Sequence, residues 1–238
     1  MSHFMNLDIE SGVSMPLVCV PAGGFEMGSP DQEEGHEAEE SPLHHVQLTK
    51  DIWMGQCPVT QRQWQAVKGR YRDQDDQEAD CPAVQVSWND AQAFAEAMNK
   101  LFPSIRFRLP TEAEWEYACR AGTTTRFAGG DTEADLAAAA WYAGNSEGRV
   151  HPVGGRRPNT WNLYDMHGNV FEWCSDWEGP YPLKTAIDPL GPDMETKRIM
   201  RGGCFKCPPP YYRSANRYSG LPDHRSTNIG FRLVGEVY

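Results

Sequence analysis

Two cysteines near the end of the chain, Cys204 and Cys207, are spaced so that their thiols could act on one metal ion or on each other. A Cys-x-x-Cys pair can hold a thiophilic metal or interconvert between dithiol and disulfide. Lys206 lies between the two cysteines, and a positive charge there is expected to lower the pKa of a thiol. Two sulfur ligands do not complete a zinc site, which takes four. The spacing therefore leaves open a soft-metal role, a redox role, or two inert cysteines.

A short loop, Asp165-Met-His-Gly-Asn-Val-Phe-Glu172, brings two carboxylates and several backbone carbonyls together. Hard cations such as Ca²⁺ need several oxygen ligands at once. The alternative is that Glu172 caps a turn while Trp173 packs in the core. This loop is thus a candidate for a structural calcium ion.

The C-terminal segment, residues 204–228, alternates between two kinds of residue. Framework positions in and just after it include arginines that are expected to fix loops by bidentate pairing with Asp and Glu: Arg213, Arg217, Arg225 and Arg232. The positions between them, the filler positions, are rich in Tyr with Ser, Gly and Pro nearby, a mixture typical of binding surfaces. The candidate ligand-binding residues are Phe205, Lys206, Pro209, Tyr211, Tyr212, Tyr218, Ser219, Leu221, His224, Ser226 and Thr227.

An alternative for the tyrosines among them is that they are ordinary half-buried loop aromatics. The composition of the segment alone does not separate this possibility from a binding surface.

Three helix starts in the first half of the chain can be predicted from their N-cap residues. Thr60, Ser87 and Thr111 each precede a stretch with apolar residues at helical spacing. Ser87 with Asp90 resembles a capping box. The third helix is expected to turn Trp115 inward and to stop at Ala121-Gly122. Beyond it the helical pattern almost vanishes, and short strands, turns and loops are expected.

Strands are predicted before and between these helices. The apolar run Met15–Val20 followed by paired glycines suggests a hairpin over residues 15–30. Residues 45–48 and 51–54 alternate as strands do. No linker or second core signature is present, so residues 15–238 are predicted to form one domain. Residues 1–14 are predicted to be an N-terminal extension or expression-tag residues.

The overall charge argues against several partner classes. The 238 residues carry a net charge of −11, which repels nucleic acid and an anionic membrane face. Six acidic residues fall within residues 31–40, which are expected to be a solvated mobile loop or else a cation site. No segment has the ~18 apolar residues of a membrane span. No signal peptide is visible, which leaves the location open, including the cell surface if a leader was removed.

The motifs in the second half have a familiar order and spacing. They are Arg108 to Ala118, Trp161 to Trp173, Arg201-Gly-Gly203, Arg213 to Arg217, Pro222-Asp223 and Asn228 to Arg232. Together they resemble the formylglycine-generating-enzyme/sulfatase-modifying-factor family over residues 15–235. The resemblance implies an α+β, C-type-lectin-like fold with few helices, short twisted antiparallel strands and much irregular loop.

The resemblance also implies three kinds of site. Oxidases of the family hold Cu(I) with two cysteine thiolates; the first position matches Cys207, but Tyr212 stands where the second is expected. A calcium ion is held in the family at the positions that match Asp165, Gly168, Val170 and Glu172. Variable proteins of diversity-generating retroelements, which share the fold, diversify the stretch that corresponds to the C-terminal segment.

Three functions follow from these observations. The preferred hypothesis is a non-catalytic protein that shows the C-terminal segment to an unknown protein or other macromolecule. The alternative is a formylglycine-generating-like copper oxidase with Cys207 and Cys204 as catalytic residues, and only this alternative requires Cu(I). A purely structural role within a larger assembly is the third possibility.

Overall fold

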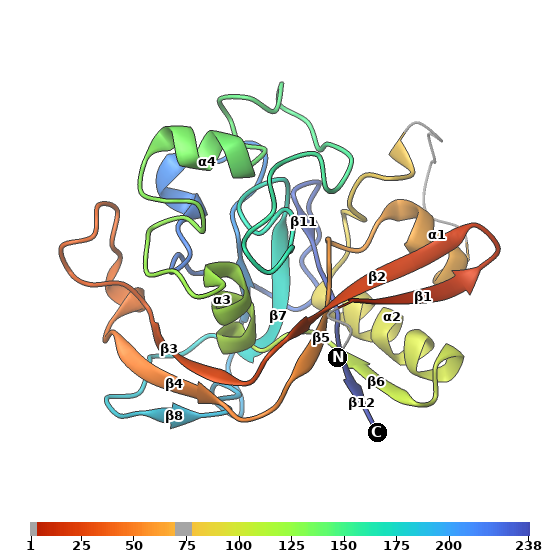
Figure 1. Ribbon diagram of the computed structural model, residues 1–238, viewed down its shortest axis with the longest axis horizontal. Helices are drawn as coiled ribbons and strands as arrows, with labels where there is room; N and C mark the ends of the chain where they lie inside the picture. The colour runs from red at the N-terminus through yellow and green to blue at the C-terminus, as the bar shows by residue number, and fades with distance from the viewer. Residues whose placement is uncertain (1–3, 70–77) are drawn as a thin grey trace.

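A computed structural model of the chain describes residues 4–69 and 78–238. Its largest sheet has five strands, with neighbouring strands antiparallel. In order across the sheet they are β1 (Phe4–Glu10), β2 (Val13–Val20), β5 (Ile52–Gly55), β12 (Val234–Val237) and β6 (Ile105–Arg108). The last strand of the chain, β12, lies between β5 and β6 and so joins them in one sheet (Figure 1).

Two smaller sheets carry the rest of the strands. One has the order β10 (Tyr218–Gly220), β9 (Arg198–Arg201), β7 (Phe171–Trp177) and β11 (Ile229–Gly230). The other has the order β3 (Gly23–Met27), β4 (His44–Leu48) and β8 (Ala186–Ile187). The strands of the four-stranded sheet come from residues 171–230. The C-terminal segment contributes β10 and is therefore part of this sheet.

The hairpin predicted over residues 15–30 is wrong. Strand β2 pairs with β1 and β5, whereas β3 pairs with β4 in a different sheet. Both edges of β2 are therefore occupied by strands other than β3. Gly23 lies directly against the ring of Tyr117 from α3 (Glu112–Arg120), where a Cβ atom would collide with the tyrosine hydroxyl. Gly23 thus permits close packing on a helix rather than a tight turn.

The N-terminal stretch predicted as an extension contributes β1, which pairs along its length with β2 at the edge of the sheet. Residues 1–3 lie outside the described residues.

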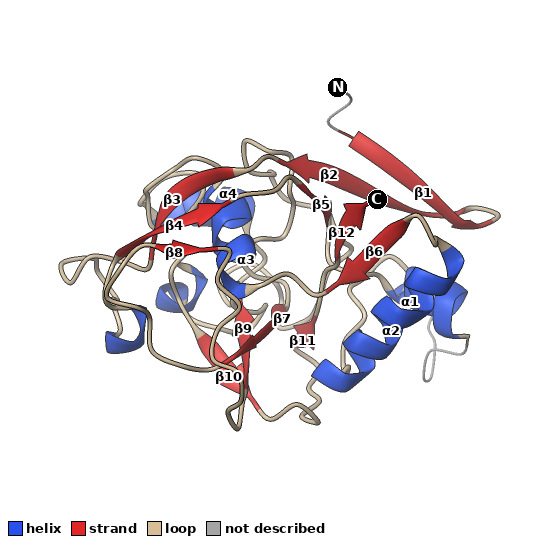
Figure 2. Ribbon diagram, turned by 90° about the horizontal axis from the view of Figure 1, so that it is seen from below, coloured by secondary structure: helices blue, strands red, loops and turns tan. Residues whose placement is uncertain are grey.

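The three predicted helix starts are confirmed. Helix α1 (Gln61–Lys68), helix α2 (Trp88–Leu101) and helix α3 begin after Thr60, Ser87 and Thr111, each in a reciprocal capping box. Such a box satisfies two backbone N–H donors that a helix start would otherwise leave unpaired. Helices α1 and α2 lie side by side at one end of the molecule, opposite the three-stranded sheet (Figures 1 and 2).

Helix α3 runs through the interior, and Trp115 is fully buried as predicted. Helix α4 (Glu133–Ala139) was not predicted. It has only two buried residues, Leu136 and Ala139, so its apolar stripe is too short to show a helical period. No helix among residues 4–69 and 78–238 is both long enough and apolar enough to cross a bilayer.

The predicted bidentate pairing of the four framework arginines is confirmed. Each guanidinium donates two hydrogen bonds of 2.6–2.9 Å to one carboxylate: Arg213 to Glu40, Arg217 to Glu112, Arg225 to Asp90 and Arg232 to Glu172. The side chains of Arg213 and Arg232 and those of their carboxylate partners are completely shielded from solvent. Removing one member of such a buried pair leaves an uncompensated charge.

We expect Glu172→Gln to lower the free energy of unfolding by about 3–5 kcal/mol, because it leaves the buried Arg232 guanidinium without a counter-charge. Urea denaturation measures the change. The control is Asp80→Asn, which breaks the exposed Arg62–Asp80 pair and should cost less than about 1 kcal/mol. Equal losses in the two variants would contradict this account of the buried pair.

Candidate functional site

The two cysteines of the Cys-x-x-Cys motif lie on one tight turn that follows β9. The Sγ atoms of Cys204 and Cys207 are 2.7 Å apart. The backbone N–H of Cys207 donates a 2.9 Å hydrogen bond to the carbonyl of Cys204. Cys204 is buried, whereas Cys207 is partly exposed. The turn therefore holds one shielded and one accessible thiol in direct contact.

Groups outside the Cys-x-x-Cys motif fix the backbone of this turn. The hydroxyl of Tyr212 lies 2.6 Å from the carbonyl oxygen of Cys204 and 2.5 Å from that of Cys207. The backbone N–H of Phe205 donates to the carbonyl of Asn169 at 2.9 Å, and the Ser146 hydroxyl donates to the carbonyl of Phe205 at 2.7 Å. The turn is thus tied to the structure on both sides.

The surroundings of the two thiols shift their pKa values in opposite directions. The hydrogen bond from Cys207 lowers the pKa of Cys204 to about 6, and donation by Asn228 Nδ2 at 3.3 Å and the charge of Lys206 act in the same direction. The pKa of Cys207 is raised, first because its thiol donates to Cys204 and second because it is desolvated. Of the two contacting thiols, Cys204 is therefore the more acidic.

Two of the predicted ligand-binding residues do not reach the surface. Phe205 and Tyr212 are buried, with relative exposures of 7% and 0%. Tyr212 packs edge-on against Tyr142 while its hydroxyl holds the cysteine turn. As a correction to the sequence-based prediction, both side chains support the surface from inside instead of contacting a ligand.

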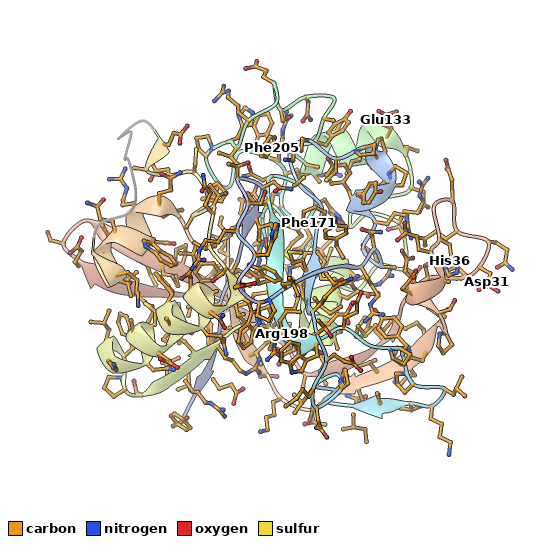
Figure 3. The ribbon with its side chains drawn as sticks, turned by 180° about the vertical axis from the view of Figure 1, so that it is seen from behind. Asp31, His36, Glu133, Phe171, Arg198 and Phe205 are labelled. Carbon is orange, nitrogen blue, oxygen red and sulfur yellow. The ribbon has the colours of Figure 1, made fainter. Side chains whose placement is uncertain are left out.

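The other nine candidates are all exposed or partly exposed: Lys206, Pro209, Tyr211, Tyr218, Ser219, Leu221, His224, Ser226 and Thr227. Tyr218 stacks on Phe171 with ring centroids 5.0 Å apart, and the Phe171 N–H donates to the carbonyl of Asn228. Asn228 in turn contacts Cys204. These contacts join the cysteine turn, β10 and the loop after it on one side of the molecule, where Figure 3 shows Phe205 and Phe171.

The acidic run of residues 31–40 forms one border of this side. It was predicted to be a solvated mobile loop, but Glu40 is buried and pairs with Arg213, which also bonds Glu33 at 3.0 Å. Between this run and β10 lies a hollow of about 390 Å³, lined by Glu37, Glu39, Glu178, Lys197, Ile199, Arg217, Tyr218 and Ser219. The acidic residues therefore belong to the C-terminal surface.

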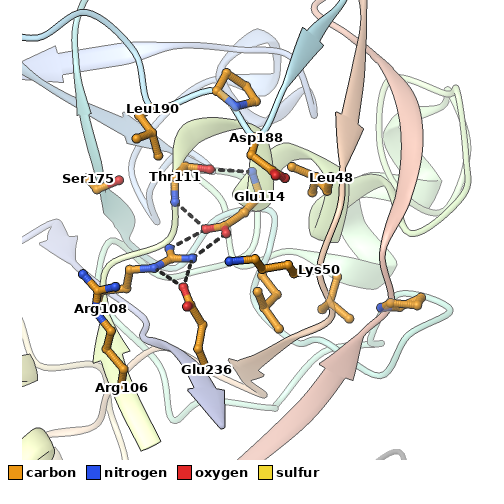
Figure 4. A pocket seen from close by; sticks show the side chains of 14 residues that line it. Leu48, Lys50, Arg106, Arg108, Thr111, Glu114, Ser175, Asp188, Leu190 and Glu236 are labelled. Atoms are coloured by element: carbon orange, nitrogen blue, oxygen red, sulfur yellow. Dashed lines mark hydrogen bonds and ion pairs between the residues drawn. The ribbon is translucent and has the colours of Figure 1, made fainter. Parts of the chain in front are cut away.

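A larger cavity, of about 510 Å³, lies elsewhere and contains none of the predicted site residues. Figure 4 shows Arg108 in its wall, where it bridges Glu114 and Glu236 through hydrogen bonds of 2.6–2.9 Å. Lys50 and Arg106 are exposed at its rim and Leu48 is part of its apolar lining. The stretch from Arg108 to Glu114 could have indicated an ion pair here, but nothing in the sequence indicated a cavity.

The positions that match calcium ligands of the family are differently occupied. Both carboxylate oxygens of Glu172 accept hydrogen bonds from Arg232, at 2.6 and 2.7 Å, and one also accepts from Trp115 Nε1. Asp165 accepts from the backbone N–H of Gly154 at 2.7 Å, and burial raises its pKa to about 6. The backbone N–H of Val170 donates to the carbonyl of Gly168.

The Arg232 guanidinium thus engages both carboxylate oxygens of Glu172, so this side chain as placed is not available to a calcium ion. In residues 4–69 and 78–238, no cluster of three or more His, Cys, Asp or Glu side chains could hold a metal ion. Calcium binding remains a prediction from the resemblance, and it would require Arg232 to leave Glu172.

Comparison with known proteins identifies the scaffold that carries these sites. Residues 13–237 match the family described as Sulfatase-modifying factor enzyme 1-like domain. The chain belongs to this family. The predicted α+β, C-type-lectin-like fold of the formylglycine-generating-enzyme type is therefore confirmed.

Its relatives include proteins with different descriptions. It is 40% identical to a formylglycine-generating enzyme of Streptomyces coelicolor over 66% of this chain but only 53% of that enzyme. It is 29% identical to that of Thermomonospora curvata over 94% of both chains. The chain therefore spans about half the length of the first relative and nearly all of the second.

Two solved structures align with almost the entire chain. Treponema denticola variable protein 1 aligns with a TM-score of 0.88 and 27% identity, covering 98% of this chain and 99% of that one. PvdO from Pseudomonas aeruginosa aligns with a TM-score of 0.86 and 30% identity over 100% of both chains. The chain is thus similar to proteins described as enzymes and to one described as a variable protein, and the site must decide between them.

Calcium gives a direct test of the occupied carboxylate. We expect the thermal midpoint of unfolding to be the same in excess calcium and in excess chelator, because Arg232 already neutralises Glu172. Differential scanning fluorimetry measures the midpoint. A rise with calcium that disappears in Asp165→Asn would show that a calcium ion displaces the guanidinium.

Proposed function

We propose that this chain is a non-catalytic ligand-binding protein that presents its C-terminal segment to a protein or another macromolecule. The observation that carries the proposal is that paired arginines anchor the segment while nine of its eleven candidate side chains are exposed or partly exposed. The anchors hold the backbone, and the filler faces solvent.

The anchors pair with carboxylates without any help from the filler. Arg213 reaches back to Glu40 and Glu33, and Arg217 pairs with Glu112 on α3. These partners lie more than 100 residues earlier in the chain. The shape of the segment is therefore set by contacts that do not involve the exposed side chains.

The exposed side chains contribute little to the fold. Leu221, His224 and Thr227 are exposed, and no side-chain hydrogen bond to another described residue fixes them. Tyr218 stacks with one face of its ring on Phe171, and 49% of the residue remains exposed to solvent. Tyrosine supplies large, rigid contact area at low entropic cost, while Ser and Gly adapt to a partner. Such positions can change with little effect on stability.

The negative charge of the surface narrows the classes of partner that it can bind. The hollow beside β10 is bordered by Glu37, Glu39 and Glu178, and the chain carries a net charge of −11. A polyanionic partner would be repelled, so nucleic acid is disfavoured. The alignment with a variable protein over nearly the entire chain supports a display function on this scaffold.

A combined variant tests the independence of scaffold and surface. We expect alanine at Lys206, Tyr218, Leu221, His224 and Thr227 together to lower the free energy of unfolding by no more than about 2–3 kcal/mol, since exposed positions cost about 0.5 kcal/mol each. Arg213→Ala alone should cost about 3–5 kcal/mol. Urea denaturation compares the two. A larger loss in the five-residue variant would make the filler structural and end the proposal.

The genome supplies a second, independent test. A diversified segment requires an adenine-rich near-copy of the codons for residues 204–228 beside a reverse transcriptase gene. The absence of both would remove the variable-type display from the proposal and leave only an invariant binding surface.

A copper-dependent oxidase is the second candidate, because the chain has formylglycine-generating relatives and a contacting thiol pair. The geometry favours it less. Two thiolates that hold one Cu(I) ion would need room for the ion between their sulfurs. The two Sγ atoms are 2.7 Å apart, so the turn would have to open. Tyr212 offers oxygen, which is a poor ligand for Cu(I).

Anaerobic titration with Cu(I) separates the two functions. We expect the wild-type protein and Cys207→Ala to take up the same, substoichiometric amount of Cu(I), since the turn holds no preformed two-sulfur site. Competition with a chromogenic chelator gives the stoichiometry. One tightly bound copper ion that is lost in Cys207→Ala would favour the oxidase.

A further inference from the structure

We infer that Cys204 and Cys207 are a site of reversible covalent modification, a dithiol that a small-molecule disulfide converts into an intramolecular disulfide within the C-terminal surface. The inference does not depend on what the surface binds. It rests on three features of the turn: the contact of the sulfurs, the fixed backbone, and the accessibility of only one thiol.

The backbone already satisfies the geometric requirement for a bridge. The hydrogen bond from Cys207 N–H to the Cys204 carbonyl closes a four-residue turn, in which the terminal Cα atoms lie within about 7 Å. Disulfides need Cα atoms about 4.4–6.8 Å apart. The sulfurs at 2.7 Å need to approach by less than an ångström to reach a bond of about 2.05 Å. Rotation of the two side chains is enough, without movement of the chain.

The surroundings keep the turn in this shape. Tyr212, Asn169 and Ser146 hold its carbonyls and its central N–H through hydrogen bonds of 2.5–2.9 Å. Little conformational freedom remains to be lost when the bridge forms. Bond formation is therefore favoured over the mixed disulfide that a flexible pair would retain.

The two thiols have different tasks. Cys207 is partly exposed and can meet a reagent from solution, whereas Cys204 is 0% exposed. Asn228 Nδ2 donates to Cys204 Sγ at 3.3 Å, which stabilises the thiolate form of the shielded sulfur. Cys207 is thus the attacking thiol and Cys204 the resolving thiol.

With oxidised glutathione as the oxidant, the steps balance. Cys204 is the more acidic thiol and releases its proton first, and Cys207 passes its own proton to the contacting Cys204 Sγ as it attacks one glutathione sulfur. The glutathione disulfide breaks, and the departing glutathione thiolate takes the proton from Cys204. The Cys204 thiolate then attacks Cys207 Sγ and expels the second glutathione, which takes up the proton released at the start. The protein is oxidised by two electrons, and the oxidant is reduced to two thiols.

Intact-mass spectrometry after incubation with oxidised glutathione, quenched in acid, tests the inference. We expect the wild-type protein to lose the mass of two hydrogens and a peptide map to join Cys204 to Cys207. Cys204→Ser should instead retain glutathione on Cys207, because the resolving thiol is gone. Cys207→Ser should react slowly, because the remaining sulfur is buried.

Cys19→Ser is the matched control, since Cys19 is another partly exposed cysteine, and it should lose two hydrogens as the wild type does. The map of the wild-type protein needs no variant to fold. The inference is overturned by a stable glutathione adduct or unchanged mass in the wild type, by a bridge between other cysteines, or by a loss of two hydrogens in Cys204→Ser.

Discussion

Buried pairing between arginine and carboxylate is the interaction on which the second half of this molecule depends. Much of that half is loop, and apolar burial alone specifies no single path for irregular chain. Arg213 ties the C-terminal segment to Glu40 across 173 residues, and Arg232 ties the last strand to Glu172 across 60. Burial removes the hydration of both charges in each pair. The hydrogen bonds of the pair offset this cost in free energy only in one geometry. The pairs therefore fix where the loops lie.

This constraint explains how a surface can be free while its support is rigid. Arg213 and Arg217 of the C-terminal segment point inward to carboxylates in earlier parts of the chain. The residues between the arginines, such as Leu221 and His224, face solvent. Under the proposed function, stability and recognition are thereby assigned to different side chains of one segment. A family whose relatives are described as enzymes and as variable proteins can use the same scaffold for either purpose.

The cysteine turn lies at the boundary between these two parts. Its outer thiol belongs to the surface, and its inner thiol belongs to the buried support. Tyr212, at the position counted for a second copper ligand, instead fixes the carbonyls of the turn. The chemistry open to the pair is therefore set by a short sulfur–sulfur contact more than by a metal.

The sequence alone predicted the features that a few neighbouring residues decide. The capping box at Ser87 follows from local hydrogen bonding, and the burial of Trp115 follows from helical periodicity. The bidentate pairing of Arg232 follows from the shape of its guanidinium. The motifs also identified the family. Only the tertiary structure decided which carboxylate each arginine meets, that β2 and β3 separate into two sheets, and that Phe205 and Tyr212 are buried. These outcomes depend on which distant segments pack together, and that choice is made by the summed burial and pairing of the entire chain, which no local pattern records.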